Sequence, residues 1–360
     1  MKNRKPKILH VLKSSVYSGA EHVVFTIIKC LRDQFDLIYI ASEGPIRKSL
    51  EQEGLPFELL PRFDRKHLKT VIKRQKPDII HAHDFSATVL CASIEGDFRL
   101  LSHLHYDPPW VTRWNAKTMV YACCRRRIEM VLMVSEQMPS RMIFAKHYRN
   151  KIQIMENPID KERIKKLSEQ LPNGDAKEDL SCDLLFVGRF VEQKNPQRFI
   201  YLIERLKRDG WNSIKAKMLG DGPLLQECQE LTKCLKLQEQ LEIKGFEKNP
   251  YPYIRQAGAL CVTSRWEGFG LVVAEASLLS VPVLSTNTSG CLGILGIGAE
   301  EICQTDDEFL NKIKLLRDHH EVYGAWKERA FTRAGEFVDV NKYKTILSEI
   351  YKNEDLRRCF

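Results

Sequence analysis

Several patterns that would assign this sequence to a class at once are absent. No run of about 18 consecutive apolar residues occurs, so no segment is expected to span a membrane as a helix. The first apolar run, residues 8–12, is shorter than the roughly 7–15 residues of a signal-peptide core and is typical of a strand. The eleven cysteines include no C-x-x-C pair and no zinc-like spacing. These absences favour a cytoplasmic protein with free thiols.

Several common motifs for binding nucleotides, metals or nucleic acids are missing as well. There is no G-x-G-x-x-G, which disfavours a dehydrogenase, and no G-x-x-x-x-G-K, which disfavours a P-loop enzyme. The segment most similar to G-x-G-x-x-G is Gly220-Asp221-Gly222. It lacks the third glycine and is followed directly by Pro223, as in a turn that enters a helix. No D-x-D occurs, so a metal-diphosphate clamp has no anchor. No nucleic-acid-binding module is recognised, and we expect no nucleic-acid partner.

Charge is unevenly distributed along the chain. The 360 residues carry 56 Lys and Arg against 47 Asp and Glu, a formal net charge of +9. Residues 1–150 hold 25 basic and 15 acidic residues, whereas the remaining 210 residues hold 31 basic and 32 acidic ones. The excess positive charge therefore lies in the first half. It predicts an anionic partner for that half, such as an anionic membrane surface.

Apolar strand-like runs alternate with helical patterns along the whole chain. This rhythm predicts parallel sheets joined by crossover helices, and the length suits two domains. We expect an α/β protein with two Rossmann-like, doubly wound domains, at 1–165 and 180–339, and a polar linker at 171–179 between them. The expected strands are 7–12, 35–41, 56–60, 78–82, 100–104, 129–134, 151–155, 183–187, 214–219, 241–245, 258–263 and 281–285.

The most informative stretch begins at Glu267 and ends at Glu275. It follows a strand-like run, contains Gly268 and Gly270, and continues into an apolar helical pattern. The first N–H groups of a helix have no intrahelical partner, so a strand, a tight loop and a helix start make an anion site that glycines leave open. Carboxylates do not bind phosphate, so the two glutamates suit the hydroxyls of a sugar and of a ribose attached to it.

A second loop of the same half carries two cations. Arg189 and Lys194 flank the segment between a strand-like run and a helix that is expected to begin near Pro196. An arginine and a lysine at a helix entrance are suited to neutralising a diphosphate.

Together these two segments resemble the retaining glycosyltransferases of family 4, which have the GT-B fold. The stretch from Glu267 to Glu275 matches their E-x7-E motif, and Arg189 with Lys194 matches their G-R-x(4)-K pattern. The resemblance implies two domains facing across a cleft, with the acceptor bound by the first and the nucleotide-sugar donor by the second. It also implies a last helix, at about 340–360, that packs back on the first domain. The implied activity is that of a retaining hexosyltransferase.

The resemblance assigns roles to particular residues. Catalytic roles fall to Glu267, His105, Arg189 and Lys194. Donor binding is assigned to Gly19, Arg189, Lys194, Lys244, Gly245, Phe246, Glu267, Gly268, Phe269, Gly270, Leu271 and Glu275. The donor is a nucleotide-diphosphate sugar, and its base is expected to be uracil. No metal and no cofactor are expected, since cationic side chains and helix dipoles can carry the phosphate charge.

Two H-x-H pairs lie at expected strand ends. Alternate strand residues share a face, so His81 with His83, and His103 with His105, could each offer two ligands to one metal ion. The resemblance instead places His105 in the donor-sugar pocket and His83, with Asp84, at the rim of the cleft. It leaves His81 in the sheet layer.

Three stretches of the first half are candidates for contact with an anionic membrane. They are a basic amphipathic pattern at 65–74, the tryptophans Trp110 and Trp114 near Lys117, and the arginines at 125–127. The resemblance implies a bacterial enzyme of capsular or exopolysaccharide synthesis, peripheral at the inner face of the cell membrane, with a saccharide or polyprenyl-linked acceptor. Two other interpretations stay open. One is a GT-B enzyme with a soluble anionic acceptor such as a sugar phosphate, and the other is a non-catalytic nucleotide-sugar-binding partner subunit.

Overall fold

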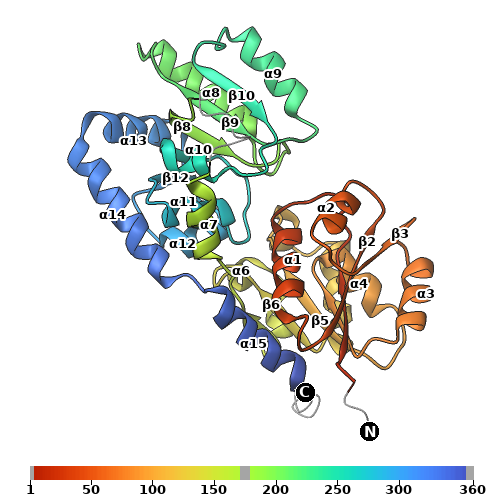
Figure 1. Ribbon diagram of the computed structural model, residues 1–360. Helices are drawn as coiled ribbons and strands as arrows, with labels where there is room; N and C mark the ends of the chain where they lie inside the picture. Colours follow the sequence, from red (N-terminus) through yellow and green to blue (C-terminus); the bar gives the residue numbers. More distant parts are fainter. Residues whose placement is uncertain (1–3, 171–178, 354–360) are drawn as a thin grey trace. The chain divides into compact units, whose positions relative to one another are not determined.

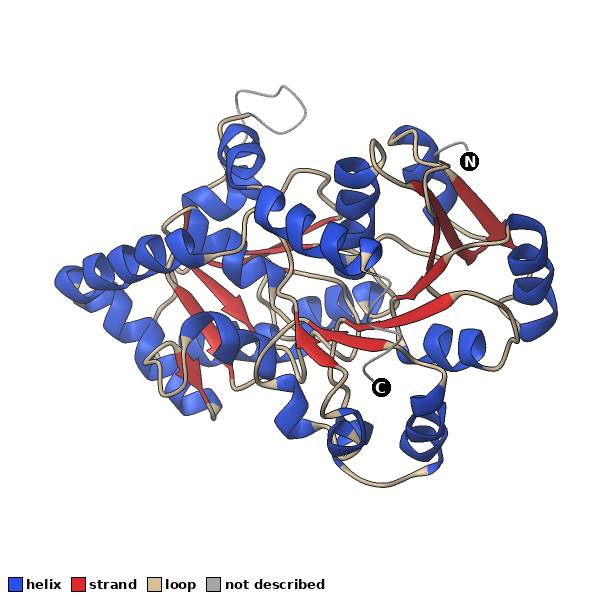
Figure 2. Cartoon of the chain, turned by 90° about the horizontal axis from the view of Figure 1, so that it is seen from below, coloured by secondary structure: helices blue, strands red, loops and turns tan. Residues whose placement is uncertain are grey.

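The computed structural model describes residues 4–170 and 179–353, and the chain divides into two compact units (Figure 1). The first unit comprises residues 1–158 and 338–360, and the second comprises 159–337. In both units strands alternate with helices along the chain, as the ribbon in Figure 2 shows. No helix in the described ranges is both long and apolar enough to cross a membrane.

The first unit is built on a seven-stranded sheet in which every pair of neighbours is parallel. The strand order is β3-β2-β1-β4-β5-β6-β7. The order reverses between β1 and β4, which is the switch point where ligands bind in doubly wound sheets. The strands are β1 (Lys7–Val11), β2 (Asp36–Ser42), β3 (Phe57–Leu60), β4 (Ile79–Ala82), β5 (Arg99–Leu104), β6 (Met130–Met133) and β7 (Ile152–Ile154).

Several helices of the first unit begin at a residue whose side chain caps them. The side chains of Asp64, Asp84 and Asn115 accept hydrogen bonds from the first backbone N–H groups of α3, α4 and α5. The helices are α1 (Gly19–Leu31), α2 (Ile46–Gln52), α3 (Arg65–Gln75), α4 (Phe85–Ala92), η1 (Pro109–Thr112), α5 (Ala116–Cys123), η2 (Cys124–Arg126), α6 (Met138–Arg141), η3 (Ala145–Tyr148) and α15 (Val340–Lys352).

The C-terminal helix α15 belongs to the first unit, where it packs against α1 (Figure 1). The buried Arg99 guanidinium donates hydrogen bonds of 2.7 and 2.8 Å to the carbonyls of Tyr351 and Ile350. The same guanidinium is paired with Glu129 at 2.6 Å. Arg99 therefore satisfies carbonyls in the last turn of α15 and ties the helix to β5.

The second unit repeats the topology with six parallel strands. Their order is β10-β9-β8-β11-β12-β13, which reverses between β8 and β11. The strands are β8 (Cys182–Val187), β9 (Ala216–Leu219), β10 (Leu241–Gly245), β11 (Ala257–Val262), β12 (Val283–Thr286) and β13 (Ile302–Cys303). All twelve expected strands are present, and β13 is an additional one.

The helices of the second unit cover this sheet around an apolar core, in which Phe190, Phe199, Phe309 and Trp326 are fully buried. They are α7 (Lys161–Ser168), α8 (Pro196–Arg208), α9 (Leu225–Cys234), α10 (Tyr251–Gln256), α11 (Leu271–Leu278), α12 (Ser289–Leu295), α13 (Asp306–Asp318) and α14 (His320–Glu336). The expected domain boundary at 165 falls inside α7, which packs against α10 and α11 and so belongs to the second unit. Except for Asp179, the expected linker lies outside the described residues.

Candidate active site

The two loops that the sequence singled out leave adjacent strands at the switch point of the second unit. One follows β8 and the other follows β11. The Thr263 hydroxyl donates to the carbonyls of Lys194 and Asn195 at 3.1 and 3.0 Å, and the Arg265 N–H donates to the Gln193 carbonyl at 2.7 Å. These bonds join the two loops at the carboxyl ends of their strands, where ligands of doubly wound sheets bind.

An ion pair connects the loops at their centre. The Lys194 ammonium contacts Glu267 Oε1, and the Ser264 hydroxyl donates to the same oxygen at 2.6 Å. Glu267 is buried, whereas Lys194 keeps about a fifth of its side chain exposed. A buried carboxylate needs such partners, because an unpaired charge costs several kcal/mol in a site of low dielectric constant. Lys194 of the G-R-x(4)-K pattern and Glu267 of the E-x7-E motif are thus in direct contact.

The backbone of Glu267 is held from a third element. The Ser289 hydroxyl and the Gly290 N–H, at the start of α12, donate to its carbonyl at 2.6 and 2.9 Å. A Cβ atom on Gly290 would lie 2.6 Å from the Phe269 backbone, so only glycine allows this approach. The sequence alone does not reveal this supporting role, because a contact across 22 positions leaves no local signal.

The loop enters α11 through a left-handed glycine. Gly270 has φ +83°, a conformation that costs a residue with a side chain about 1–2 kcal/mol. The chain thereby turns into α11 directly after Phe269, and no side chain caps the helix. The first N–H groups of α11 therefore have no side-chain cap, which is the geometry that the predicted anion site requires.

Glu275 lies one turn into α11 and accepts a hydrogen bond of 3.1 Å from the Tyr251 hydroxyl. Burial raises the pKa of this carboxyl from its ordinary 4.5 to about 7, against the opposing effects of Tyr251, Lys194 and Arg163. The sequence gave no indication of Tyr251, which comes from a different helix, α10. Glu275 is a hydrogen-bonding carboxyl that sits near its titration point at neutral pH.

Arg189 follows β8 and is exposed. Within the described ranges its guanidinium has no hydrogen-bonding or ionic partner, in contrast to Lys194. The loop that begins with it ends at Asn195, which takes a left-handed φ of +51° and occupies the N-cap position of α8, just before Pro196, without a side-chain cap hydrogen bond. The site therefore holds one cation already paired with a carboxylate and a second one free to meet an anion.

The G-x-G-P turn supports the loop after β8. Cβ atoms on Gly220 and Gly222 would lie 1.9 Å from the Gly188 carbonyl oxygen and 2.6 Å from the Phe190 carbonyl oxygen. The role of the turn is structural, because its glycines let two backbones meet.

The end of β10 supplies the remaining residues that were assigned to donor binding. The Gly245 carbonyl accepts from the Gly220 N–H at 2.7 Å, and Gly245 itself has a left-handed φ of +84°. The Lys244 ammonium is paired with Glu242 at 3.3 Å, and the side chain of Phe246 is largely exposed. Phe246 is the only one of these side chains that offers an unpaired apolar surface to a ligand.

The first unit holds the two other residues assigned from sequence. Gly19 opens α1, directly after β1 and its loop, where the Ser18 hydroxyl is bonded to the buried Glu21. His105 follows β5 and is buried, with Nε2 3.0 Å from His83 Nδ1. Burial lowers the pKa of His105 to about 3, an effect that the neighbouring Asn157 side chain opposes, so the imidazole is neutral at pH 7.

One expectation about the histidines is wrong. His83 was expected at the rim of a cleft with Asp84, but it is fully buried in the first unit. Asp84 is buried too, and its carboxylate caps α4 by accepting from the Ala87 N–H at 2.7 Å. Both residues are held by the sheet and helix around them, which sequence alone does not reveal.

Two family models match the chain. A model of the group 1 glycosyl transferases matches residues 160–333, and a model of glycosyltransferase family 4 matches residues 17–163. The chain is a family 4 glycosyltransferase. The expected enzyme class is thereby confirmed.

Relatives of this glycosyltransferase span most of its length. An uncharacterized glycosyltransferase of Methanocaldococcus jannaschii is 24% identical over 85% of this chain and 78% of its own. A Campylobacter jejuni enzyme is 30% identical over 53% of this chain and 51% of its own, and it is named an N-acetylgalactosaminyltransferase acting on a diphospho-undecaprenol-linked sugar. The Anabaena protein HepE, solved with UDP-glucose, is 21% identical, covers 96% of this chain and 98% of its own, and superposes with a TM-score of 0.79. This last likeness is one of fold and confirms the expected two-domain GT-B architecture.

In this family 4 glycosyltransferase the two switch-point loops of the second unit, with α11, carry eight of the twelve residues predicted to bind the donor. The ammonium of Lys194, the guanidinium of Arg189 and the N–H groups at the start of α11 can oppose negative charge. The carboxyls of Glu267 and Glu275 can accept hydrogen bonds from hydroxyl groups. Such an arrangement can hold an anion whose substituents carry hydroxyls.

Proposed function

We propose that this enzyme transfers a hexose, with retention of anomeric configuration, from a UDP-sugar to a saccharide or lipid-linked acceptor in the synthesis of a cell-surface polysaccharide. The observation that carries the donor assignment is the Lys194–Glu267 pair, held between the two switch-point loops beside the uncapped N-terminus of α11. A cation, free N–H groups and a carboxylate meet there within one unit of the fold. The negatively charged diphosphate of the donor suits the cation and the N–H groups, and the hydroxyls of its sugar suit the carboxylate.

In this account the leaving diphosphate is stabilised by charge alone. Negative charge grows on the β-phosphate as the bond from the anomeric carbon to its oxygen breaks. Arg189, Lys194 and the N–H groups of residues 269–271 oppose that charge, and donors aimed at developing charge are each worth about 10²–10³-fold in rate. No metal is required for this step, because the side chains and the helix supply the positive charge.

The two glutamates orient the donor. Glu275 is proposed to accept from the ribose hydroxyls, and Glu267 from hydroxyls of the transferred sugar. Lys194 and Ser264 already fix Glu267 Oε1, which suits a positioning carboxylate better than a nucleophile. We therefore infer a same-face substitution, in which the acceptor oxygen forms the new bond and its proton passes to the departing phosphate. His105 is proposed to contact the donor sugar, as in the family.

Uracil is the proposed base. The support is the fold shared with HepE, which was solved with UDP-glucose. The exposed ring of Phe246 and the backbone around Gly245, at the end of β10, are the groups proposed to face the base. An aromatic surface stacks on any base, so hydrogen bonds to the backbone would have to select uracil.

The acceptor is proposed to be membrane-bound. Three large apolar side chains at and just before α5 are exposed: Trp114 by 47%, Met119 by 58% and Val120 by 49%. Two exposed cations are close to them in the sequence, with Arg113 directly before Trp114 and Lys117 between Trp114 and Met119. Exposed apolar side chains next to cations suit an anionic lipid surface, and the acceptor named for the Campylobacter relative is lipid-linked.

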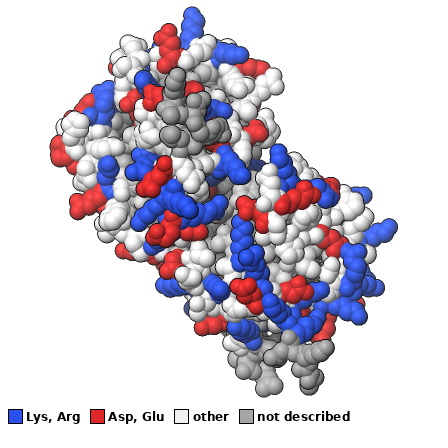
Figure 3. All heavy atoms as spheres, viewed as in Figure 1, with Lys and Arg blue, Asp and Glu red and all other residues white. Residues whose placement is uncertain are grey.

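Two of the three stretches expected to contact a membrane do not support this proposal. The apolar face of α3, made by Leu68, Val71 and Ile72, is buried in the first unit, so this helix has no apolar surface to insert. At 125–127, Arg125 donates to the His147 carbonyl, and Arg127 donates to the carbonyls of residues 96 and 98. On the face shown in Figure 3, basic side chains are interspersed with acidic ones rather than gathered in one patch.

The test is thermal stabilisation of the full chain by UDP-, GDP- and ADP-sugars without added metal. We expect the UDP-sugars to raise the melting temperature, and Arg189→Ala to reduce that rise. Stabilisation by another nucleotide class would replace uracil, and no stabilisation by any class would contradict the donor assignment. Proton NMR of the first-formed product then tests retention. Transfer to lipid-linked acceptors in vesicles, against transfer to soluble sugar phosphates, decides the acceptor class.

A further inference from the structure

The first unit contains five histidines in one buried cluster. Each has at most 8% of its surface exposed, and neighbouring rings lie 4.1–5.4 Å apart between centroids. They come from β1, β4 and β5 and the residues that follow β4 and β5. The cluster consists of His10, His81, His83, His103 and His105. Half of the ten histidines of the chain are thus gathered in a part of the core that ordinary packing would fill with apolar side chains.

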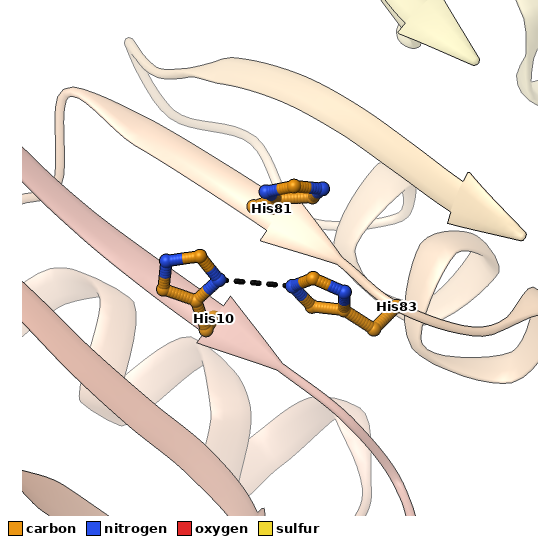
Figure 4. A group of neighbouring side chains, drawn as sticks. All are labelled: His10, His81 and His83. Carbon is orange, nitrogen blue, oxygen red and sulfur yellow. Dashed lines mark hydrogen bonds between the residues drawn. The ribbon is translucent and has the colours of Figure 1, made fainter. Parts of the chain in front are cut away.

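Three of the five converge across two strands (Figure 4). His10 on β1 and His81 on β4 are partners in the parallel register, and His83 follows two residues later on the same face. His10 Nδ1 lies 2.9 Å from His83 Nε2. Taking one ring nitrogen from each residue, the three atoms lie within 4.8 Å of one another.

His81 is oriented as a metal-binding histidine usually is. Its Nδ1 lies 2.7 Å from the hydroxyl of Tyr351 on α15, while its Nε2 is buried without a partner in the described part of the chain. A histidine that binds a metal through one nitrogen is commonly held by a hydrogen bond at the other. A buried polar atom without a partner is costly, so the free Nε2 itself points to a missing ligand.

From this geometry we propose that His10, His81 and His83 bind one divalent transition-metal ion of the zinc, cobalt or nickel class. Imidazole nitrogens suit these ions, whereas magnesium and calcium require oxygen ligands that the three residues do not supply. The site lies in the first unit, beside His105, and uses none of the residues proposed to bind the donor. It ties β1 and β4 to the C-terminal helix through His81 and Tyr351.

Binding would require a small rearrangement and no net loss of protons. In a tetrahedral zinc site with Zn–N bonds of about 2.0–2.1 Å, ligand nitrogens are about 3.3 Å apart. The His10–His83 contact opens slightly, and the His81 ring, now stacked 4.1 Å from His83, turns toward that contact. The three imidazoles are neutral, so each retains one proton on its other nitrogen while its lone pair binds the ion. The proton that lies between His10 Nδ1 and His83 Nε2 moves, on binding, to the other ring nitrogen of whichever residue carries it.

A second triad, made by His83, His103 and His105, meets the same distance criterion. We assign the ion to the first triad because, within the described residues, His81 Nδ1 is the one ring nitrogen of the cluster with a hydrogen-bond partner outside the cluster. Both nitrogens of His103 lack partners among the residues that the structure describes, and its ring lies 5.2 Å from that of His81. We therefore infer that His103 is the residue best placed to supply a fourth ligand.

The test is titration of the chelator-treated full chain with Zn²⁺ by calorimetry and with Co²⁺ by visible absorption. We expect one ion per chain, with the absorption of a Co²⁺ ion bound by nitrogen ligands. His81→Leu and His10→Leu should abolish binding, whereas the exposed His320→Leu, which also removes one histidine, should leave it unchanged. Tyr351→Phe keeps all three ligands and should weaken binding about ten-fold, which tests the site even if the leucine variants do not fold.

Each remaining outcome also decides the proposal. No binding by the wild type, or full binding by both leucine variants, would overturn it. Loss of binding in His105→Ala together with unchanged binding in His81→Leu would overturn the choice of triad. Zn²⁺ should also raise the melting temperature of the wild type and of His320→Leu, but not that of His81→Leu.

Discussion

The two switch points of this enzyme share a topology and differ in chemistry. In the second unit the loops after β8 and β11 present an ion pair, a free guanidinium and an uncapped helix start. In the first unit the corresponding strands, β1 and β4, carry neutral imidazoles that face one another in the core. The strand order determines where a ligand can bind, and the side chains at that place determine which ligand it is.

Burial explains the difference in charge. Burial lowers the pKa of His10 to about 3 and holds the pKa values of His81 and His83 well below their ordinary range, so these groups stay neutral. Lys194, by contrast, is partly exposed and forms an ion pair with the Glu267 carboxylate. The side chains of the second unit therefore suit an anion, whereas those of the first unit suit a ligand that accepts lone pairs.

The largest effect is expected from Lys194→Ala. This change removes a cation from the developing diphosphate charge and leaves Glu267 buried without its ion pair. We expect kcat/KM to fall about 10³-fold, measured with a UDP-sugar and a saturating acceptor. Lys314→Ala breaks an exposed pair with Asp209 in the same unit and serves as the control, with activity expected to stay within two-fold, or about 0.4 kcal/mol. Equal effects of the two substitutions would contradict the assignment.

In the first unit the largest effect is expected on stability. Arg99→Ala leaves the largely buried Glu129 without its partner and the last carbonyls of α15 without a donor. We expect a loss of about 3–5 kcal/mol in the free energy of unfolding, measured by urea denaturation. Arg4→Ala breaks an exposed pair with Asp78 in the same unit and should cost less than about 1 kcal/mol. A small effect of Arg99→Ala would mean that α15 is held mainly by apolar packing.

The pH dependence of stability should report on Glu275. Its pKa is higher in the folded chain, about 7, than its ordinary 4.5, so the folded state binds the proton more tightly and this stabilisation is lost as pH rises from about 4.5 to above 7. Glu275→Gln should therefore match the wild type near pH 4 and be more stable by roughly 2–3 kcal/mol at pH 8. Melting temperatures across this range, with the exposed Glu239→Gln as control, check the sign. A constant difference across the range would show that Glu275 is not desolvated.

The smallest effect concerns two glycines of the second unit. Gly270 has φ +83°, with ordinary contacts around its missing Cβ, so Gly270→Ala should cost about 1–2 kcal/mol through backbone strain. Gly324 lies inside α14 with nothing near its missing Cβ, and Gly324→Ala should instead stabilise by about 0.5–1 kcal/mol. Thermal melts of the two variants should shift in opposite directions. A shift in the same direction would remove the argument for strain at the start of α11.

Much of the fold follows from local pattern. Buried parallel strands are continuous apolar runs bounded by turns, and each expected strand has its counterpart in the two sheets. β13 escaped detection because it has only two residues, Ile302 and Cys303, too few for any periodicity. The boundary at 165 was misplaced because the partners of α7, which are α10 and α11, lie about 85–110 positions further along the chain.

The site was predictable where one loop carries several of its residues. Glu267, Gly270 and Glu275 belong to one strand–loop–helix segment, so spacing alone indicates their shared location. The support given by Ser289 and Tyr251 depends on tertiary packing and has no local pattern. His10 shows the same limit, since its approach to His83 depends on the register of β1 and β4 across 73 positions.

Calorimetric titration of the full chain with a UDP-sugar, without metal, should decide whether the second switch point holds the donor. We expect one binding site per chain, with affinity reduced at least ten-fold by Arg189→Ala and unchanged by Lys314→Ala. Affinity should also be unchanged in Tyr351→Phe, because Tyr351 lies in the first unit. Undetectable binding to the wild type, or equal affinities of the wild type and Arg189→Ala, would contradict the claim that the second switch point is the donor site.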